Sequence, residues 1–459
     1  MATPVLWEPQ PKQHLLLSCP VDDVLFGGAR GGGKSDALLG DWWAHATCYP
    51  QHARGLLVRR SFPELDELIV RSQELFPATG GRWNEQRHVW TWKAGARLRL
   101  RPLEHDKQVR NLQGSNHTWL GADEMTNWPG PGMLDKLRAT LRSAHGVPCY
   151  FRGTANPGGV GHNWVKKRYI DPAPPLVPFV DEVGTQRVFI PSTLDDNVVL
   201  TTQDPQYWQR VQASAAGRED LLKAWRYGLW DIVAGGMFDD LWDPAVHIVA
   251  PFRVPASWRV DRSHDWGSAK PFCTLWYAES TGEAVESAAG VWRSYPRGTL
   301  FVIAEDYGMQ PGKDNEGIGG TPALICGRVK AVEAGLGRKA QPGPADDPLW
   351  DTSRGRAMID EHVALGVSWL KPSKGPGSRI TGWTLLRQRL EASLKQPMEK
   401  PGLFVFNTCR HLLRTLPVLP RDTRNPDDVD TEAEDHAADA LRLKLLSIGT
   451  PMQSRRYTA

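Results

Sequence analysis

Short apolar runs alternate with amphipathic stretches along the first 160 residues. The run "VDDVLFGG" at 21–28 ends in glycines, and the segment 35–49 that follows has apolar residues at helical spacing. Further strands are predicted at 54–61, 117–124 and 147–159, a helix at 62–77, and a hairpin at 88–103. Strands that alternate with helices indicate βαβ units and a mostly parallel sheet, and therefore an α/β fold.

The pattern changes twice in the middle of the chain. It becomes helical from about 200 to 232, and the glycines and prolines between about 235 and 255 are typical of a linker. We therefore expect one domain at 1–240, a second at 255–450, and a flexible tail at 451–459. The second domain is predicted to contain strands within 258–280, 298–309 and 402–407, a helix followed by a strand at 356–372, helices at 383–395 and 431–449, and a long loop at 310–348 that includes one helix.

Composition excludes several classes of protein. Hydrophobic residues make up 41% and charged residues 23% of 459 positions, as in ordinary soluble domains, and a net charge of +3 does not by itself indicate a nucleic-acid partner. The six cysteines are scattered without a C-x-x-C pair, so neither a zinc site nor a disulfide framework is expected. No apolar run reaches the length of a membrane span, and the first residues do not resemble a signal peptide. The 20 tryptophans are interpreted as core packing rather than as a base-stacking surface.

The stretch "GARGGGKS" matches the phosphate-binding pattern G-x-x-x-x-G-K-[ST]. Gly28, Gly33, Lys34 and Ser35 occupy its fixed positions, between a predicted strand and a predicted helix. Glycines let backbone N–H groups turn toward phosphate oxygens at the positive end of the helix dipole. Lys34 would reach the β- and γ-phosphates of ATP, and the Ser35 hydroxyl would bind Mg²⁺.

Two later strand ends complete such a site. "WLGADE" ends in Asp123, expected on the magnesium side, and in Glu124, expected to orient the attacking water. "GTANPGG" follows the next strand, and Thr154 and Asn156 lie where an ATPase would sense the γ-phosphate. A plain Asn-Pro-Gly turn is the alternative interpretation of that stretch.

Two further roles, recognition of adenine and stabilisation of phosphoryl transfer, each have more than one candidate residue. Gln13 is a candidate for reading the adenine edge, with Gln10 as its rival and a solvated glutamine as the alternative. Arg30, inside the loop, is the candidate for stabilising phosphoryl transfer within one subunit. An arginine from a neighbouring subunit could act instead, and the candidates are Arg101, Arg138 and Arg142.

The second half carries separated carboxylates of the kind that two-metal nucleases use. Asp265 ends the first strand of that half. Asp346 and Asp347 follow a proline-rich turn, and Asp435 and Asp439 share one face of the last helix. Oxygen ligands suit Mg²⁺, for which Mn²⁺ can substitute. Glu305 and Asp306 at a strand end are interpreted as supporting or surface residues.

In combination and order, these motifs resemble the large terminase subunit of tailed bacteriophages. The resemblance is carried by "GGARGGGKS", "WLGADEMTNW" and "GTANPGGVGHNWVKKRYI" in the first half, and by "HDWGSAKPF", "ADDPLWD" and "EDHAADALRL" in the second. It implies an ASCE-type P-loop ATPase domain followed by an RNase H-like nuclease domain. Asp265, Asp347 and Asp439 would form the metal-binding triad, with Asp346 competing for the second place and Asp435 as a further candidate.

The family resemblance also implies an activity and partners. ATP hydrolysis would move double-stranded DNA into a procapsid, and a metal-dependent endonuclease would cut the concatemer. The expected partners are the portal protein, the small terminase subunit and further copies of the chain in a ring, with the free chain able to be monomeric. The expected location is the host cytoplasm and, transiently, the portal vertex.

Two other functions stay open at this stage. One is a DNA helicase or repair ATPase whose second half only binds DNA. The other is an assembly protein whose sites have lost their activity. Loss of metal-dependent cleavage on substitution of Asp265 or Asp439 would discriminate against the first, and loss of ATP hydrolysis on substitution of Lys34 against the second.

Overall fold

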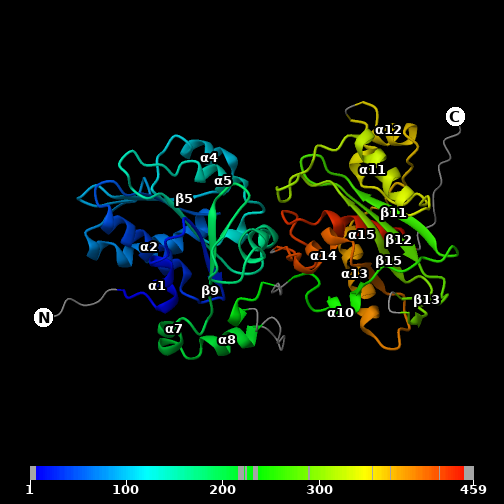
Figure 1. Ribbon diagram of the computed structural model, residues 1–459, viewed down its shortest axis with the longest axis horizontal. Coiled ribbons are helices and arrows are strands. Elements are labelled where there is room, and N and C mark those ends of the chain that lie inside the picture. Colours follow the sequence, from blue (N-terminus) through cyan, green and yellow to red (C-terminus); the bar gives the residue numbers. More distant parts are fainter. Residues whose placement is uncertain are drawn as a thin grey trace. The chain divides into compact units, whose positions relative to one another are not determined.

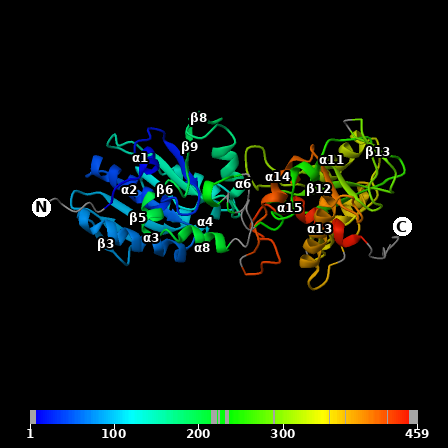
Figure 2. The same ribbon diagram turned by 90° about the horizontal axis from the view of Figure 1, so that it is seen from below.

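The computed structural model divides the chain into two compact units, Met1–Gly235 and Gly236–Ala459 (Figures 1 and 2). It describes residues 7–214, 222, 225–230, 236–287, 290–353, 355–372, 374–422 and 424–448. The expected tail, 451–459, lies outside these residues. Within the described helices, none is long and apolar enough to cross a membrane.

Unit 1 is built on a nine-stranded sheet in the order β3-β4-β5-β2-β6-β7-β1-β9-β8. The strands are β1 (Asp23–Gly28), β2 (Arg54–Arg59), β3 (Arg82–Asn84), β4 (Val89–Thr91), β5 (Arg97–Pro102), β6 (Trp119–Ala122), β7 (Tyr150–Ala155), β8 (Phe179–Val180) and β9 (Gln186–Ser192). All neighbouring pairs from β5 to β9 are parallel, and β3, β4 and β8 add antiparallel edges. β7 lies between β1 and β6. The predicted α/β fold with a mostly parallel sheet is therefore confirmed.

Helices cover both faces of this sheet (Figure 1). The helices described in unit 1 are α1 (Pro11–Leu17), α2 (Lys34–Cys48), α3 (Phe62–Leu75), α4 (Asp106–Leu112), α5 (Gly132–Arg138), α6 (His162–Val165), α7 (Val198–Gln203) and α8 (Tyr207–Ser214). Leu57 and Leu98 pack with α2 and α3 on one face, whereas Leu56 and Val58 pack with α4 and α5 on the other. A parallel sheet buried on both faces explains why its strands appear as continuous apolar runs.

Local sequence explains several element boundaries in unit 1. α3 begins after Ser61, which forms a capping box with Glu64, and Pro63 lies in the first turn, where its missing N–H is harmless. The predicted hairpin at 88–103 is confirmed as the antiparallel pair β4 and β5. β9, which pairs with β1, is not anticipated by the sequence pattern.

Unit 2 contains a five-stranded sheet in the order β10-β16-β15-β12-β11. The strands of this unit are β10 (Ile248–Val249), β11 (Arg259–Asp265), β12 (Cys273–Glu279), β13 (Val285–Glu286), β14 (Trp292–Arg293), β15 (Leu300–Tyr307) and β16 (Leu403–Phe406), with β13 and β14 forming a separate hairpin. β11, β12 and β15 are antiparallel neighbours, and β16 runs parallel to β15.

The sequence predicts a long loop with one helix over 310–348, but the last residues of this segment pair with a strand. Residues 341–345 lie parallel to β11 through the bridges Asp261–Gln341 and His264–Ala345, and Pro344 in turn bridges to Leu370. β11 is therefore flanked by an antiparallel meander on one side and by parallel segments on the other. Unit 2 is therefore an α/β domain built on a mixed sheet.

The helices of unit 2 are α10 (Pro244–His247), α11 (Pro322–Gly335), α12 (Met358–Ala364), α13 (Ser378–Leu394), α14 (Arg410–Thr415) and α15 (His436–Ser447). α15 and α13 lie side by side (Figures 1 and 2). α15 is tied to β11 by a hydrogen bond of 2.6 Å from Ser263 Oγ to the Ala440 carbonyl and by the buried ion pair Lys444–Asp261. This contact brings the end of β11 to the start of α15.

The tryptophans behave as the composition suggested. Among the largest fully buried side chains, eight are tryptophans: Trp42, Trp90, Trp119, Trp128, Trp164, Trp258, Trp276 and Trp383. Their interpretation as core packing in both units is confirmed.

Candidate functional site

The glycine-rich loop follows β1 and leads into α2. Gly33 has φ of +69° and Gly28 has φ of +136°, conformations that residues with a side chain rarely adopt. A Cβ at Gly28 would lie 2.6 Å from the Ser192 carbonyl oxygen. The loop therefore needs glycine at both positions to place its backbone N–H groups at the start of α2.

Lys34 and Ser35, the first residues of α2, face the end of β6. Lys34 is buried and donates to the Ala29 carbonyl at 2.6 Å, and Ser35 Oγ donates to Asp123 Oδ2 at 3.1 Å. Burial lowers the pKa of Lys34, while the carboxylates of Glu124 and Asp123 oppose that shift. Serine and aspartate oxygens at hydrogen-bond distance are the donor pair that suits Mg²⁺, so these residues fit the ion.

Asp123 and Glu124 face the same edge because the chain turns between them. Glu124 is in the left-handed region, with φ of +59° and ψ of +54°. Thr154 Oγ donates to Asp123 Oδ1 and accepts from the Glu124 N–H at 3.1 Å. Asn156 Nδ2 donates to both Glu124 carboxylate oxygens at 3.1 Å. Burial, and then the charge of Asp123, raises the pKa of Glu124, which favours a role as proton acceptor.

Arg59 is a member of this cluster that sequence reasoning missed. It ends β2, is buried, and pairs with Asp123 through a 2.6 Å contact to Oδ2. Its Nη1 also donates to the Glu64 carbonyl at 2.5 Å. The available signal was its position, because the carboxyl ends of parallel strands meet at one edge of a sheet.

Gln13 and Arg30 both lie against the loop. Gln13 is buried and its Nε2 donates to the Gly33 carbonyl at 2.8 Å, whereas the rival Gln10 donates to Asn197 at 2.6 Å. The Arg30 guanidinium lies over the Trp225 ring, 4.7 Å from its centre. Of the alternative arginines, Arg138 is enclosed by Asp23 and Asp135, so it is poorly placed to act on a neighbouring subunit.

In unit 2, Asp265 is buried at the end of β11 and lies against α15. Its Oδ2 is 3.3 Å from His436 Nδ1, and His436 Nε2 is 3.1 Å from Asn315 Oδ1. Burial, together with the charges of Asp439 and Asp346, raises the pKa of Asp265 to about 6. The predicted acids of β11 and α15 are thus electrostatic neighbours.

Two arginines neutralise the acids of α15. Arg379, on α13, donates at 3.1 Å to Asp435 and at 3.1 Å to Asp439, and Arg442 donates to Asp439 at 2.9 Å. Burial and the charge of Asp439 raise the pKa of Asp435 to about 7. Burial acts the same way on Asp439, but Arg442 and Arg379 outweigh it and lower the pKa of Asp439. Neither arginine was anticipated from the sequence.

Asp346 and Asp347 differ in their surroundings. Asp346 follows the segment that pairs with β11, and its N–H donates to the His264 carbonyl at 3.0 Å, directly beside Asp265. Asp347 begins the 3₁₀ helix η4 (Asp347–Trp350), and its side chain is 50% exposed. Lys374 contacts both carboxylates. The charge of Asp346 contributes to the raised pKa of Asp265.

The acids of unit 2 suit a hard cation by donor type, since all are carboxylates. Across the described residues, however, no three His, Cys, Asp or Glu side chains are placed so that they could hold a metal ion. Arg379, Arg442 and Lys374 instead contact the carboxylates of four of these acids, Asp346, Asp347, Asp435 and Asp439. Glu305 accepts from the backbone N–H groups of His411 and Leu412 at the start of α14, and Asp306 pairs with Arg328. These last two acids have structural partners.

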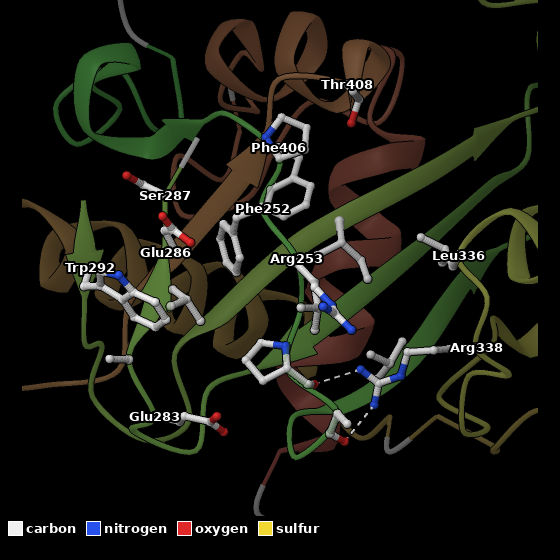
Figure 3. Close-up of a pocket in the computed structure, with 18 of the residues that line it drawn as sticks. Phe252, Arg253, Glu283, Glu286, Ser287, Trp292, Leu336, Arg338, Phe406 and Thr408 are labelled. Carbon is white, nitrogen blue, oxygen red and sulfur yellow. Dashed lines mark hydrogen bonds between the residues drawn. The ribbon is translucent and has the colours of Figure 1, made fainter. Parts of the chain in front are cut away.

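A separate groove of about 1190 Å³ lies elsewhere on unit 2 (Figure 3). Phe252, Trp292 and Phe406 contribute apolar walls, and Arg338 donates to the carbonyls of Pro255 and Ala256. None of the predicted site residues lines this groove.

No protein-family model and no curated protein matches the chain. Among solved structures, the large terminase of a thermophilic bacteriophage is similar over 96% of this chain and 99% of that one, at 17% identity and a TM-score of 0.42. The HK97 bacteriophage large terminase is similar over 96% and 95%, at 12% identity and a TM-score of 0.44. The nuclease domain of the P22 large terminase covers 46% of this chain and 92% of its own, at 18% identity and a TM-score of 0.33. The two matches to complete large terminases extend over most of this chain, at low sequence identity.

Proposed function

We propose that this chain is the large subunit of a terminase, which hydrolyses ATP to move double-stranded DNA into a viral procapsid and cuts that DNA with a metal-dependent nuclease. The observation that carries the proposal is the closed set of contacts at the carboxyl edge of the unit 1 sheet. Ser35, Asp123 and Thr154 come from three separate segments and form one hydrogen-bonded chain.

Each residue of this edge has a role in hydrolysis. Lys34 neutralises phosphate oxygens, and Ser35 with Asp123 would hold Mg²⁺, which neutralises charge on the phosphates when it is bound. Glu124 accepts a proton from the attacking water, and Asn156 fixes the orientation of the Glu124 carboxylate. Gln13 supports the loop from outside, and Arg30 is the candidate for stabilising the developing charge.

Thr154 and Asn156 couple this chemistry to movement. Both belong to the end of β7 and the turn that follows, and both are bonded to the acids of β6. A change at Glu124 after hydrolysis would therefore pass directly to the 153–159 turn.

For cleavage, the residues of unit 2 that would hold metal are Asp265, Asp439 and one of Asp346 and Asp347, with Asp435 beside them. A bound divalent cation would activate water and stabilise the leaving oxygen of the DNA backbone. His436 orients Asp265, and Arg379 balances the charge of the α15 acids.

The proposed partners follow from the same role. They are double-stranded DNA, the portal protein, the small terminase subunit and further copies of this chain in a ring. The proposed place of action is the host cytoplasm and the portal vertex of the procapsid.

The ATPase half is tested with Lys34→Ala and Glu124→Gln in the full chain. Both should lower the rate of phosphate release from ATP by about a hundredfold or more, because each removes a group that acts on the transferred phosphate or the water. Glu124→Gln should still bind ATP, measured with a fluorescent analogue. Hydrolysis at the wild-type rate by both variants would contradict the proposal.

The nuclease half is tested with Asp265→Ala. Cleavage of plasmid DNA in Mn²⁺ should disappear while ATP hydrolysis persists. A wild-type chain that hydrolyses ATP but never cuts DNA would instead favour a helicase or repair ATPase.

A further inference from the structure

A second cavity, which lies in unit 1, has an unusual charge. Its volume is about 300 Å³, and its lining includes Arg54, Arg97, Arg99 and Arg142 but no aspartate or glutamate. We call these four arginines and the space between them the basic cavity. Like charges gathered without a counter-charge repel one another, so such a site favours an anion.

The arginines of the basic cavity lack carboxylate partners. Arg54 donates from its guanidinium only to backbone carbonyls, at 2.9 to 3.2 Å, and Arg99 donates to the Ser115 hydroxyl at 3.3 Å. Arg142 donates to the Asn116 side chain. Within the described part of the chain, the guanidinium of Arg97 has no hydrogen bond or ion pair.

Five other arginines of unit 1 are neutralised by carboxylates. Arg59, Arg138, Arg152, Arg168 and Arg187 each pair with a carboxylate. At the basic cavity, four arginines without a carboxylate partner among the described residues line one space, and the guanidinium of Arg97 remains available to a ligand.

The pKa values of groups around the basic cavity agree with an excess of positive charge there. Burial and then the charge of Arg97 lower the pKa of Arg54, and burial and then Arg99 lower the pKa of His117, which also lines the cavity, to about 4. Each group thus feels the positive charge of its neighbours.

The basic cavity is distinct from the nucleotide site. Arg54 and Arg97 begin β2 and β5, and Thr118 of the lining directly precedes β6. These are the amino ends of parallel strands, whereas Lys34 and Asp123 lie at the carboxyl edge. The nucleotide phosphates therefore do not account for this charge.

We infer that the basic cavity binds the phosphate backbone of double-stranded DNA without regard to sequence. Arginine with serine and asparagine side chains is the donor set that contacts DNA phosphates, and Ser115, Asn116 and Ser143 supply the uncharged donors. Arg97 and Arg142 reach the surface, so a polymer can contact them. The choice of DNA over a small phosphate ion rests on the proposed function.

The test uses the full chain and a labelled 30-base-pair duplex of arbitrary sequence in EDTA, with binding measured by fluorescence anisotropy at several salt concentrations. The double variant Arg97→Gln/Arg99→Gln should bind about 10- to 100-fold more weakly at low salt. The slope of log affinity against log salt should fall by about 2, because each lost phosphate contact removes about 0.9. ATP hydrolysis without DNA should not change.

The matched control is Arg82→Gln/Arg87→Gln. These exposed arginines on and after β3 do not line the cavity, and their replacement changes the net charge equally. The control should alter affinity less than about threefold and leave most of the slope. The single variant Arg97→Gln replaces the double variant if the latter unfolds, as judged by circular dichroism.

A second arm separates DNA from free phosphate. Inorganic phosphate is titrated at constant ionic strength, and thermal stabilisation is compared between wild type and the cavity variant. If the variant loses phosphate binding but keeps full DNA affinity and slope, the cavity is a small-anion site and the inference is overturned. Equal DNA binding by cavity and control variants also overturns it. Lys34→Ala should lose hydrolysis but keep DNA binding, so failure of the cavity and failure of the ATPase proposal are distinguishable.

Discussion

Arg59 and Arg379 play the same electrostatic part in the two units. Arg59 lies against Asp123, and Arg379 lies against Asp435 and Asp439, all acids predicted to serve a metal site. A buried carboxylate without a cation is strongly disfavoured, so an arginine stabilises each set in the absence of metal. A divalent cation bound at these acids, as proposed, would take over part of this neutralisation.

The choice between Asp346 and Asp347 can be decided with two equal substitutions. Asp346→Asn should abolish Mn²⁺-dependent DNA cleavage, because Asp346 follows the segment beside β11 and its charge acts on Asp265. Asp347→Asn should keep at least about a third of the activity, since its side chain is 50% exposed and lies at the start of η4. Initial cleavage rates measure both. The opposite ranking would assign the metal ligand to Asp347.

At the level of single residues, sequence motifs predict which acids and which lysine lie close together, because their spacing and the strand ends can be recognised in the sequence. They do not predict Arg59, Arg379 or Lys374, whose partners lie far along the chain and meet them only in the fold. For the same reason, the separate surroundings of Asp346 and Asp347 became apparent only in the structure.

Among the elements, the segment 341–345 departs most from its sequence pattern. Pro342 and Pro344 argue against a central strand, since proline cannot donate to a ladder. Here the chain pairs through other groups: the Pro344 carbonyl accepts from His264 N–H, and the N–H groups of Gln341 and Ala345 donate to neighbouring segments. Period-two alternation could not reveal this segment, whereas the apolar runs of β1, β2 and β6 were recognisable.

A substitution at Gly343 tests whether the segment 341–345 packs against β11. A Cβ there would lie 1.9 Å from the Arg262 carbonyl oxygen of β11, so Gly343→Ala should destabilise the protein by about 1–3 kcal/mol. Gly335→Ala, at the end of α11 with open space around it, should instead be neutral or stabilising by up to about 1 kcal/mol. Chemical denaturation followed by circular dichroism measures both. Equal stability of the two variants would show that the segment is not held against β11.

The whole molecule contains buried histidines in both units. Burial lowers the pKa of His45, His117 and His362 to about 4 and that of His264 to about 3. Their folded-state pKa values lie below the unfolded value of about 6.5. As pH falls below about 6.5 the unfolded chain takes up protons that the folded chain does not, so stability is lost. Asp265 and Asp435, with raised pKa values, act in the opposite direction.

Comparison of His45→Gln with wild type measures how much one buried histidine contributes to the pH dependence of stability. Near pH 7 the wild type should be the more stable protein, because His45 is buried and bonded to Thr118 at 2.8 Å. That advantage should shrink by about 2 kcal/mol between pH 7 and pH 5. Denaturation midpoints at the two pH values measure it, with the exposed His14→Gln as the matched control. An equal change with pH in both variants would contradict the assignment.

β2 and β6 each reach from one binding edge of unit 1 to the other. β2 begins with Arg54 in the basic cavity and ends with Arg59, which pairs with Asp123. β6 begins beside Thr118 and ends beside Asp123. Six residues of strand span roughly 20 Å and resist stretching, because every peptide is held by neighbours on both sides. A displacement of Asp123 or Arg59 along the strand axis would therefore arrive at the far end almost undiminished. Under the proposed function, these central strands would carry a displacement from the nucleotide site to the basic cavity at the opposite edge of the sheet.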